Sequence, residues 1–203
     1  MKFIKNNIST LLLVNTASGI NYLFQVAVAR KLSVDDFGIF NSLNALVAIL
    51  SAPFSIVTLI CSRSTAQLSS KNISCVKALI ITALKVMLFL GISAFFLGVM
   101  AMPILKQYLH IQFNLPIILM LIYWGLTFLM PVFIGVLQGL KRFEGFGLIC
   151  GSYSLTRLLL GLLWVVVLGW GVSGAILAEV TGYIVTIFLG FWLLRDLMKT
   201  IPE

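Results

Sequence analysis

Two charged residues, Arg157 and Glu179, stand inside long apolar segments of the sequence. A guanidinium in a hydrocarbon environment costs about 2.5 to 3.5 kcal/mol on insertion scales, so something must compensate Arg157. Glu179 is the one acidic residue well inside such a segment, and a short hairpin at Trp170-Gly171 separates it from Arg157. Counted from the hairpin, the two residues differ in depth by roughly 7 Å, which two long side chains or a water molecule would bridge.

This pair of charges has two interpretations. In the first, Arg157 and Glu179 form a structural ion pair. In the second, Arg157 holds an anionic group of a substrate, while Glu179 titrates or binds a coupling cation. Each interpretation accounts for the cost of burial.

Polar side chains recur at helical spacing in the first two apolar segments. The first stripe contains Asn15, Ser18, Tyr22 and Gln25, and the second contains Asn41, Asn44, Ser51, Ser55, Thr58 and Ser62, with Ala48 filling the gap. Residues three and four positions apart share one face of a helix, so we expect both stripes to face inward. Hydrogen bonding between helices and the wall of a hydrated substrate cavity are both consistent with this pattern.

The elements that position these residues are membrane-spanning helices. Of the 203 residues, 61% are hydrophobic and 10% are charged, and the mean hydropathy is +1.12, far outside the range of soluble proteins. Each apolar segment exceeds about 20 residues, which favours helices over the ten-residue strands of a membrane barrel. We therefore predict an all-α, polytopic membrane protein in which residues 1–203 form a single membrane domain. Its six helices cover about residues 7–29, 37–60, 78–102, 115–138, 146–169 and 172–194.

Basic residues between the spans predict the orientation of the bundle. With the N-terminus inside, nine of them lie on the cytoplasmic side, namely Lys2, Lys5, Arg63, Lys71, Lys77, Lys141, Arg142, Arg195 and Lys199. Three lie outside: Arg30, Lys31 and Lys106. This asymmetry predicts that both termini are cytoplasmic, and it explains the net charge of +8 without a nucleic-acid partner.

Other residues that often carry chemistry are sparse. Cys61, Cys75 and Cys150 lack metal-binding spacing and are expected to be reduced thiols, and His110, the single histidine, falls in a predicted outer loop. The sequence contains no nucleotide-binding loop, hydrolase nucleophile motif or zinc-protease motif. We therefore expect neither an enzyme nor a metal site or cofactor.

Prolines and aromatic residues inside the spans suggest local structure. Pro53 and Pro131 remove backbone hydrogen bonds and predict bends or hinges. We expect packing or interfacial anchoring from the aromatic residues Tyr123, Trp124, Trp164, Trp170 and Trp192. Ser33 precedes Asp35 and Asp36 and predicts a helix N-cap.

Three stretches of the sequence occur in an order that carries a family resemblance. They are ARKLSVDDFGIFNSL at residues 29–43, GVLQGLKRF at 135–143 and GWGVSGAILA at 169–178. Together they resemble the bacterial polysaccharide-unit flippases of the multidrug/oligosaccharidyl-lipid/polysaccharide exporter superfamily. The likeness extends over nearly the whole chain, and the combination of motifs is more specific than any one of them.

The resemblance implies a transporter in the bacterial inner membrane that moves undecaprenyl-diphosphate-linked oligosaccharides during O-antigen or capsule synthesis. Arg30 matches the arginine that ends the family's first helix, Gly38 the glycine that opens the second, and Arg157 a basic position in the fifth. With the two polar stripes, Arg157 would line the path of the headgroup, because a buried arginine makes bidentate contacts with phosphate oxygens.

The family has twelve to fourteen helices, whereas this sequence contains six spans, so we expect one lobe of a two-lobe transporter. A second lobe or a homodimer would have to complete it. Two alternatives stay open: a multidrug or small-molecule cation antiporter of the same superfamily, and a truncated, non-transporting partner of the polysaccharide polymerase machinery. The partners implied are a lipid-linked oligosaccharide and membrane lipids.

Overall fold

The computed structural model describes residues 2–69, 73–109, 111 and 113–199, and this part of the chain contains helices and no strand. Six helical stretches are long and apolar enough to cross a membrane: Thr10–Lys31, Val34–Ser69, Ser74–Tyr108, Asn114–Gly139, Phe143–Val167 and Gly171–Leu197. The prediction of an all-α, multi-pass membrane protein with six spans is therefore confirmed.

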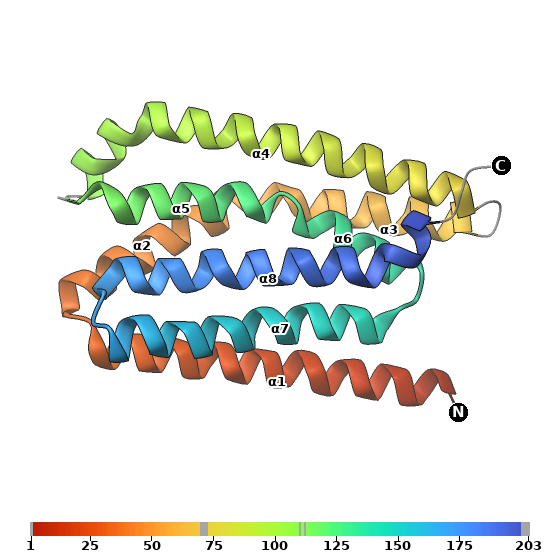
Figure 1. Cartoon of the computed structure of the whole chain (residues 1–203), viewed down its shortest axis with the longest axis horizontal. Coiled ribbons are helices and arrows are strands. Elements are labelled where there is room, and N and C mark those ends of the chain that lie inside the picture. Colours follow the sequence, from red (N-terminus) through yellow and green to blue (C-terminus); the bar gives the residue numbers. More distant parts are fainter. Residues whose placement is uncertain (1, 70–72, 110, 112, 200–203) are drawn as a thin grey trace.

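The helices run side by side along one long axis (Figure 1). In chain order they are α1 (Lys2–Lys31), α2 (Val34–Ser51), α3 (Ser55–Ser69), α4 (Ile73–Leu109), α5 (Asn114–Thr127), α6 (Met130–Gly139), α7 (Phe143–Gly161) and α8 (Gly171–Lys199). A short 3₁₀ segment, Ala52–Phe54, joins α2 to α3, and a π-helical segment, Leu162–Val167, extends α7. α1 begins and α8 ends at the same end of the bundle, as an even number of spans requires.

Two of the six spans are interrupted near their middle. The second changes from α2 to α3 at the segment that contains Pro53, and the fourth changes from α5 to α6 just before Pro131. Proline has no N–H to donate to the preceding turn, so the helical hydrogen-bond ladder breaks there. The predicted continuous helices 37–60 and 115–138 are thus each two helices, at the positions where bends were expected.

Two apolar clusters hold the bundle together. The cluster at the end where α1 turns into α2 includes the buried residues Phe24, Phe40 and Ile176, and the cluster toward the other end includes Phe133 and Leu194. The three most extensive helix–helix contacts are those between α1 and α7, between α3 and α6, and between α7 and α8. α2 instead leaves α1 after their turn and crosses toward α5, so the first two spans diverge (Figure 1).

Candidate functional site

The arginine of α7 and the glutamate of α8 meet inside the bundle. An Arg157 guanidinium nitrogen, Nη2, forms an ion pair with Glu179 Oε1, and the two side chains are 13% and 1% exposed. Of the two expected ways to bridge the depth difference, the long side chains do so directly, without a water molecule between them. The π-helical segment Leu162–Val167 lies between Arg157 and the hairpin and contains more residues per turn than an α-helix, which brings Arg157 closer to the level of Glu179.

Neighbouring polar groups complete the coordination of the pair. The Tyr153 hydroxyl donates a hydrogen bond to Glu179 Oε2. Arg157 Nη1 donates to Asn21 Oδ1 of α1 at 3.1 Å, and Asn21 Nδ2 donates to Ser154 Oγ at 2.9 Å. The charged pair therefore joins three helices, α1, α7 and α8, with Asn21 of α1 bound to the arginine and Tyr153 of α7 bound to the glutamate.

Two glycines make room for the aromatic rings around this cluster. The Arg157 guanidinium carbon lies 4.1 Å from the centre of the Phe24 ring, in cation–π geometry. A Cβ atom added at Gly161 would lie 2.2 Å from Phe24 Cε2, and one added at Gly182 would lie 3.1 Å from the Tyr153 ring. Small residues at these positions allow the rings to reach the charged pair.

Tyrosine rings in edge-to-face and tilted contact connect the charged cluster to a polar cavity. The Tyr153 and Tyr183 ring centres are 4.8 Å apart, and those of Tyr183 and Tyr123 are 5.2 Å apart. Tyr123 and Tyr183 line a cavity of about 320 Å³ at the two interrupted spans. Ser51, Ser55, Thr58 and Thr127 contribute hydroxyl groups to the same wall. Tyr123 is thus part of a polar surface, a role that its aromatic type alone did not indicate.

The polar stripe of the first span does not pack inside this bundle. Asn15, Ser18 and Tyr22 are exposed, and the side chain of Ser18 donates to the carbonyl oxygen of Val14 in its own helix. Within the described chain, the expectation that these three residues face inward is wrong, because α1 packs on α7 through a different face. That face contains Ala17, Asn21, Phe24 and Val28, which recur with the same helical spacing.

Gln25 is the member of the first stripe that contacts the second. Its Nε2 donates to Asn41 Oδ1 at 2.8 Å near the turn between α1 and α2. Asn44 donates to the Phe40 carbonyl of its own helix at 3.2 Å.

At the interruption of the second span, Ser51 Oγ lies 3.2 Å from Thr127 Oγ1 in hydrogen-bonding contact. Ser55 is exposed and donates to the Ala52 carbonyl at 2.9 Å. In the second stripe, Asn41 and Asn44 therefore make contacts near the turn between α1 and α2, whereas Ser51, Ser55 and Thr58 line the polar cavity.

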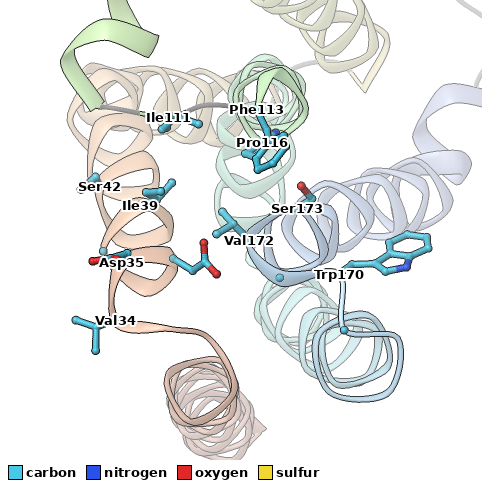
Figure 2. A pocket seen from close by; sticks show the side chains of 14 residues that line it. Val34, Asp35, Ile39, Ser42, Ile111, Phe113, Pro116, Trp170, Val172 and Ser173 are labelled. Carbon is cyan, nitrogen blue, oxygen red and sulfur yellow. The ribbon is translucent and has the colours of Figure 1, made fainter.

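A larger pocket, of about 920 Å³, lies at the end of the bundle where α2, α5 and α8 begin. Figure 2 shows Ile39 on α2, Pro116 on α5 and Ser173 on α8 around it. Gly38 lines the pocket, whereas Arg30 is exposed at the end of α1. The structure therefore does not bring these two family-motif residues to the Arg157 cluster.

The start of α2 beside this pocket is a capped helix terminus. Ser33 Oγ accepts a hydrogen bond from the Asp36 backbone N–H at 3.1 Å, as predicted. In the hairpin before α8, Gly169 and Gly171 have φ angles of +67° and +56°, a region that favours glycine.

No group of three His, Cys, Asp or Glu side chains that could hold a metal ion occurs within residues 2–69, 73–109, 111 and 113–199. Cys61, Cys75 and Cys150 are free thiols. His110 and Lys71 lie outside the described residues.

No family model matches the chain, and neither a curated protein nor a solved structure matches it significantly. Its function must therefore be inferred from the site. A buried, neutralised arginine lies next to tyrosines in edge-to-face and tilted contact, which lead to a hydroxyl-lined cavity, and α1 carries an exposed polar face.

Proposed function

We propose that the chain forms one lobe of a flippase that moves lipid-linked oligosaccharides across the bacterial inner membrane. The observation that carries this proposal is the exposed polar face of a membrane-spanning helix, formed by Asn15, Ser18 and Tyr22 on α1. Polar groups facing hydrocarbon are unfavourable, so water or a second protein surface must cover this face. A hydrated path between this lobe and a second lobe, or a second copy, would place water and protein against this face.

The chemistry of a diphosphate-linked sugar suits the groups along this path. Amide and hydroxyl side chains on α1 are suitable hydrogen-bond partners for sugar hydroxyls, and the Arg157 guanidinium contacts the same helix through Asn21. Arg157 Nε is buried and has no hydrogen-bond partner among the described residues. In the proposed mechanism, a phosphate oxygen takes part of the coordination that Glu179 now provides, and the Tyr153 hydroxyl keeps Glu179 satisfied.

The pairing of Glu179 favours a flippase over the antiporter alternative. A cation or proton antiporter needs an intramembrane acid that is available to its coupling ion. Both carboxylate oxygens of Glu179 are already engaged, one by Arg157 and the other by Tyr153. An ion would have to displace one of these internal partners.

The exposed stripe provides the test. In a strain that depends on the native gene for surface polysaccharide, the double variant Asn15→Leu/Tyr22→Leu should abolish export while protein abundance stays at the wild-type level. The matched control, Leu12→Ala/Leu23→Ala, alters two exposed apolar positions of the same helix and should leave export unchanged.

Normal export by Asn15→Leu/Tyr22→Leu would show that the stripe does not line a substrate path. Altered drug tolerance with unchanged surface polysaccharide would instead favour the antiporter. A normally inserted protein whose Arg157→Ala variant and stripe variant both leave export intact would favour the non-transporting partner.

A further inference from the structure

The turn between α6 and α7 presents two cations at one end of the bundle. Lys141 and Arg142 are exposed there, at the end where α1 begins and α8 ends (Figure 1). The distribution of basic residues predicts that this end is cytoplasmic. Neither side chain forms an ion pair with a carboxylate among the described residues. Both positive charges are therefore available to a ligand.

The backbone of this turn holds Lys141 in a conformation that favours glycine. Its φ angle is +57°, and within the described chain it is the only residue other than glycine with a positive φ. The Lys141 N–H donates to the Gln138 carbonyl at 3.0 Å. The Arg142 N–H donates to the Leu137 carbonyl at 2.9 Å, which completes a Schellman motif at the end of α6. Glycine is the usual residue at this position, so a lysine here indicates that its side chain has a use that offsets the backbone strain.

A pocket of about 370 Å³ lies beside the two cations, between the turn and the last part of α8. Its polar side chains are Lys141, Arg142 and Glu144, and its apolar wall includes Leu137, Leu148 and Leu193. Arg142 Nη1 donates to the Leu193 carbonyl oxygen at 3.3 Å, which holds the guanidinium at the pocket. Leu148 is 47% exposed, so the apolar wall is open to the side of the bundle. A charged rim thus meets an apolar surface at the end of the membrane-spanning helices.

The charges of this lining favour a ligand with one negative charge. Two cations and the Glu144 carboxylate leave the pocket with a net charge of +1. A phosphodiester carries a single negative charge, and its oxygens accept hydrogen bonds from ammonium and guanidinium groups. The volume is near the lower limit of about 300 Å³ for small-molecule sites, which suits one small headgroup and not an oligosaccharide. The leucine wall adds a surface for a hydrocarbon chain, which a free phosphate ion would not use.

We propose that this pocket binds the phosphodiester headgroup of an anionic phospholipid of the cytoplasmic leaflet, such as phosphatidylglycerol. Lys141 and Arg142 contact the phosphate oxygens, and Glu144 accepts a hydrogen bond from a headgroup hydroxyl. One acyl chain of the lipid lies along Leu148 and Leu193. The site shares no residue with the charged pair inside the bundle, and it does not depend on the proposed transport function.

Native mass spectrometry of the full chain in detergent counts bound lipids and tests the site. The probe is an equimolar mixture of phosphatidylglycerol and zwitterionic phosphatidylethanolamine with the same acyl chains. The wild type should retain one phosphatidylglycerol more tightly than any phosphatidylethanolamine. Lys141→Gly removes one cation and should bind this lipid about fivefold more weakly, as expected for roughly 1 kcal/mol per cation near the membrane surface. Its melting temperature should be unchanged or higher, because glycine suits the positive φ.

Matched variants separate the pocket from the general charge at this end of the bundle. Arg142→Gln should also weaken binding about fivefold, whereas Arg142→Lys keeps the charge and should bind nearly as well as the wild type. Arg63 is an exposed cation of α3, at the end that is predicted to be cytoplasmic, and it does not line the pocket. Arg63→Gln should therefore leave the tightly bound lipid in place.

Three results would overturn the assignment. Equal retention of the two lipids by the wild type would show that the headgroup charge is not recognised. Equal loss of phosphatidylglycerol in Arg63→Gln and Arg142→Gln would show that overall charge, and not the pocket, holds the lipid. Displacement of the lipid by an equimolar amount of glycerol phosphate would mean that the pocket binds free phosphate esters. The proposed function would survive each of these results, because its own test uses the polar stripe of α1.

Discussion

The two sides of this bundle handle polarity inside the membrane in different ways. Where α1, α7 and α8 pack together, the Arg157–Glu179 pair lies between spans that are not broken by proline, and every neighbour supplies a specific contact. Where the α2–α3 and α5–α6 spans face each other, both spans are interrupted, and the polar groups are hydroxyls around an open cavity.

This difference shows what each kind of backbone tolerates. A full charge in low dielectric needs fixed partners, and well-packed helices provide them. An interrupted helix leaves backbone groups that small hydroxyl side chains can satisfy, as Ser55 and Thr127 do for the carbonyls of Ala52 and Trp124. The first side is thus expected to be rigid and sensitive to substitution, and the second adaptable.

The largest expected effect comes from breaking the charged pair. Glu179→Leu leaves the Arg157 guanidinium buried without a counter-charge and should lower the free energy of unfolding in detergent micelles by about 3 to 5 kcal/mol. The double variant Arg157→Met/Glu179→Leu should recover most of this loss. The exposed pair Arg195–Asp196, with 3.7 Å between its charged atoms, is the control, and Asp196→Asn should cost no more than about 1 kcal/mol. Equal effects of Glu179→Leu and Asp196→Asn would mean that water screens the inner pair.

A smaller effect tests the close packing of the same side. Gly161→Ala forces a methyl group against the Phe24 ring and should destabilise the protein by about 1 to 3 kcal/mol in the same unfolding measurement. Gly151, also on α7, has no atom within 4 Å of an added Cβ. Gly151→Ala should therefore be neutral or stabilise by up to about 1 kcal/mol through helix propensity. Tolerance of Gly161→Ala would show that α1 and α7 separate easily.

The smallest effect is expected at the interrupted spans. Thr127→Val removes a hydroxyl that donates to the Trp124 carbonyl at 2.6 Å and lies 3.2 Å from Ser51 Oγ. Hydrogen bonds between membrane helices contribute about 0.6 kcal/mol on average, so thermal unfolding should shift only slightly. Ser55→Ala, at an exposed position whose hydroxyl bonds within its own segment, should shift it less. A Thr127→Val effect as large as that of Glu179→Leu would contradict the contrast between the two sides.

The length and apolarity of the segments were sufficient to predict six spans, and Pro53 and Pro131 indicated where two of them break. The lone opposite charges and the short hairpin likewise predicted that Arg157 and Glu179 are neighbours. Periodicity did not identify the packed face of α1, because it shows which residues share a face and not which face meets a neighbour. The contact residue is Asn21, adjacent in sequence to the predicted Tyr22.

The π-helical segment Leu162–Val167 lets one of the two helices of the charged pair absorb a change in chain length. All six of its residues are apolar, and none of them is charged. A π-helical turn holds about one residue more than an α-helical turn, so deleting a single residue there would close the segment as ordinary α-helix and leave the direction of Arg157 relative to the hairpin nearly unchanged. A residue deleted between Gly171 and Glu179 of α8 meets no such segment and would rotate Glu179 by about 100°, away from Arg157. One side of the ion pair thus tolerates a reading-frame-preserving deletion that the other side does not.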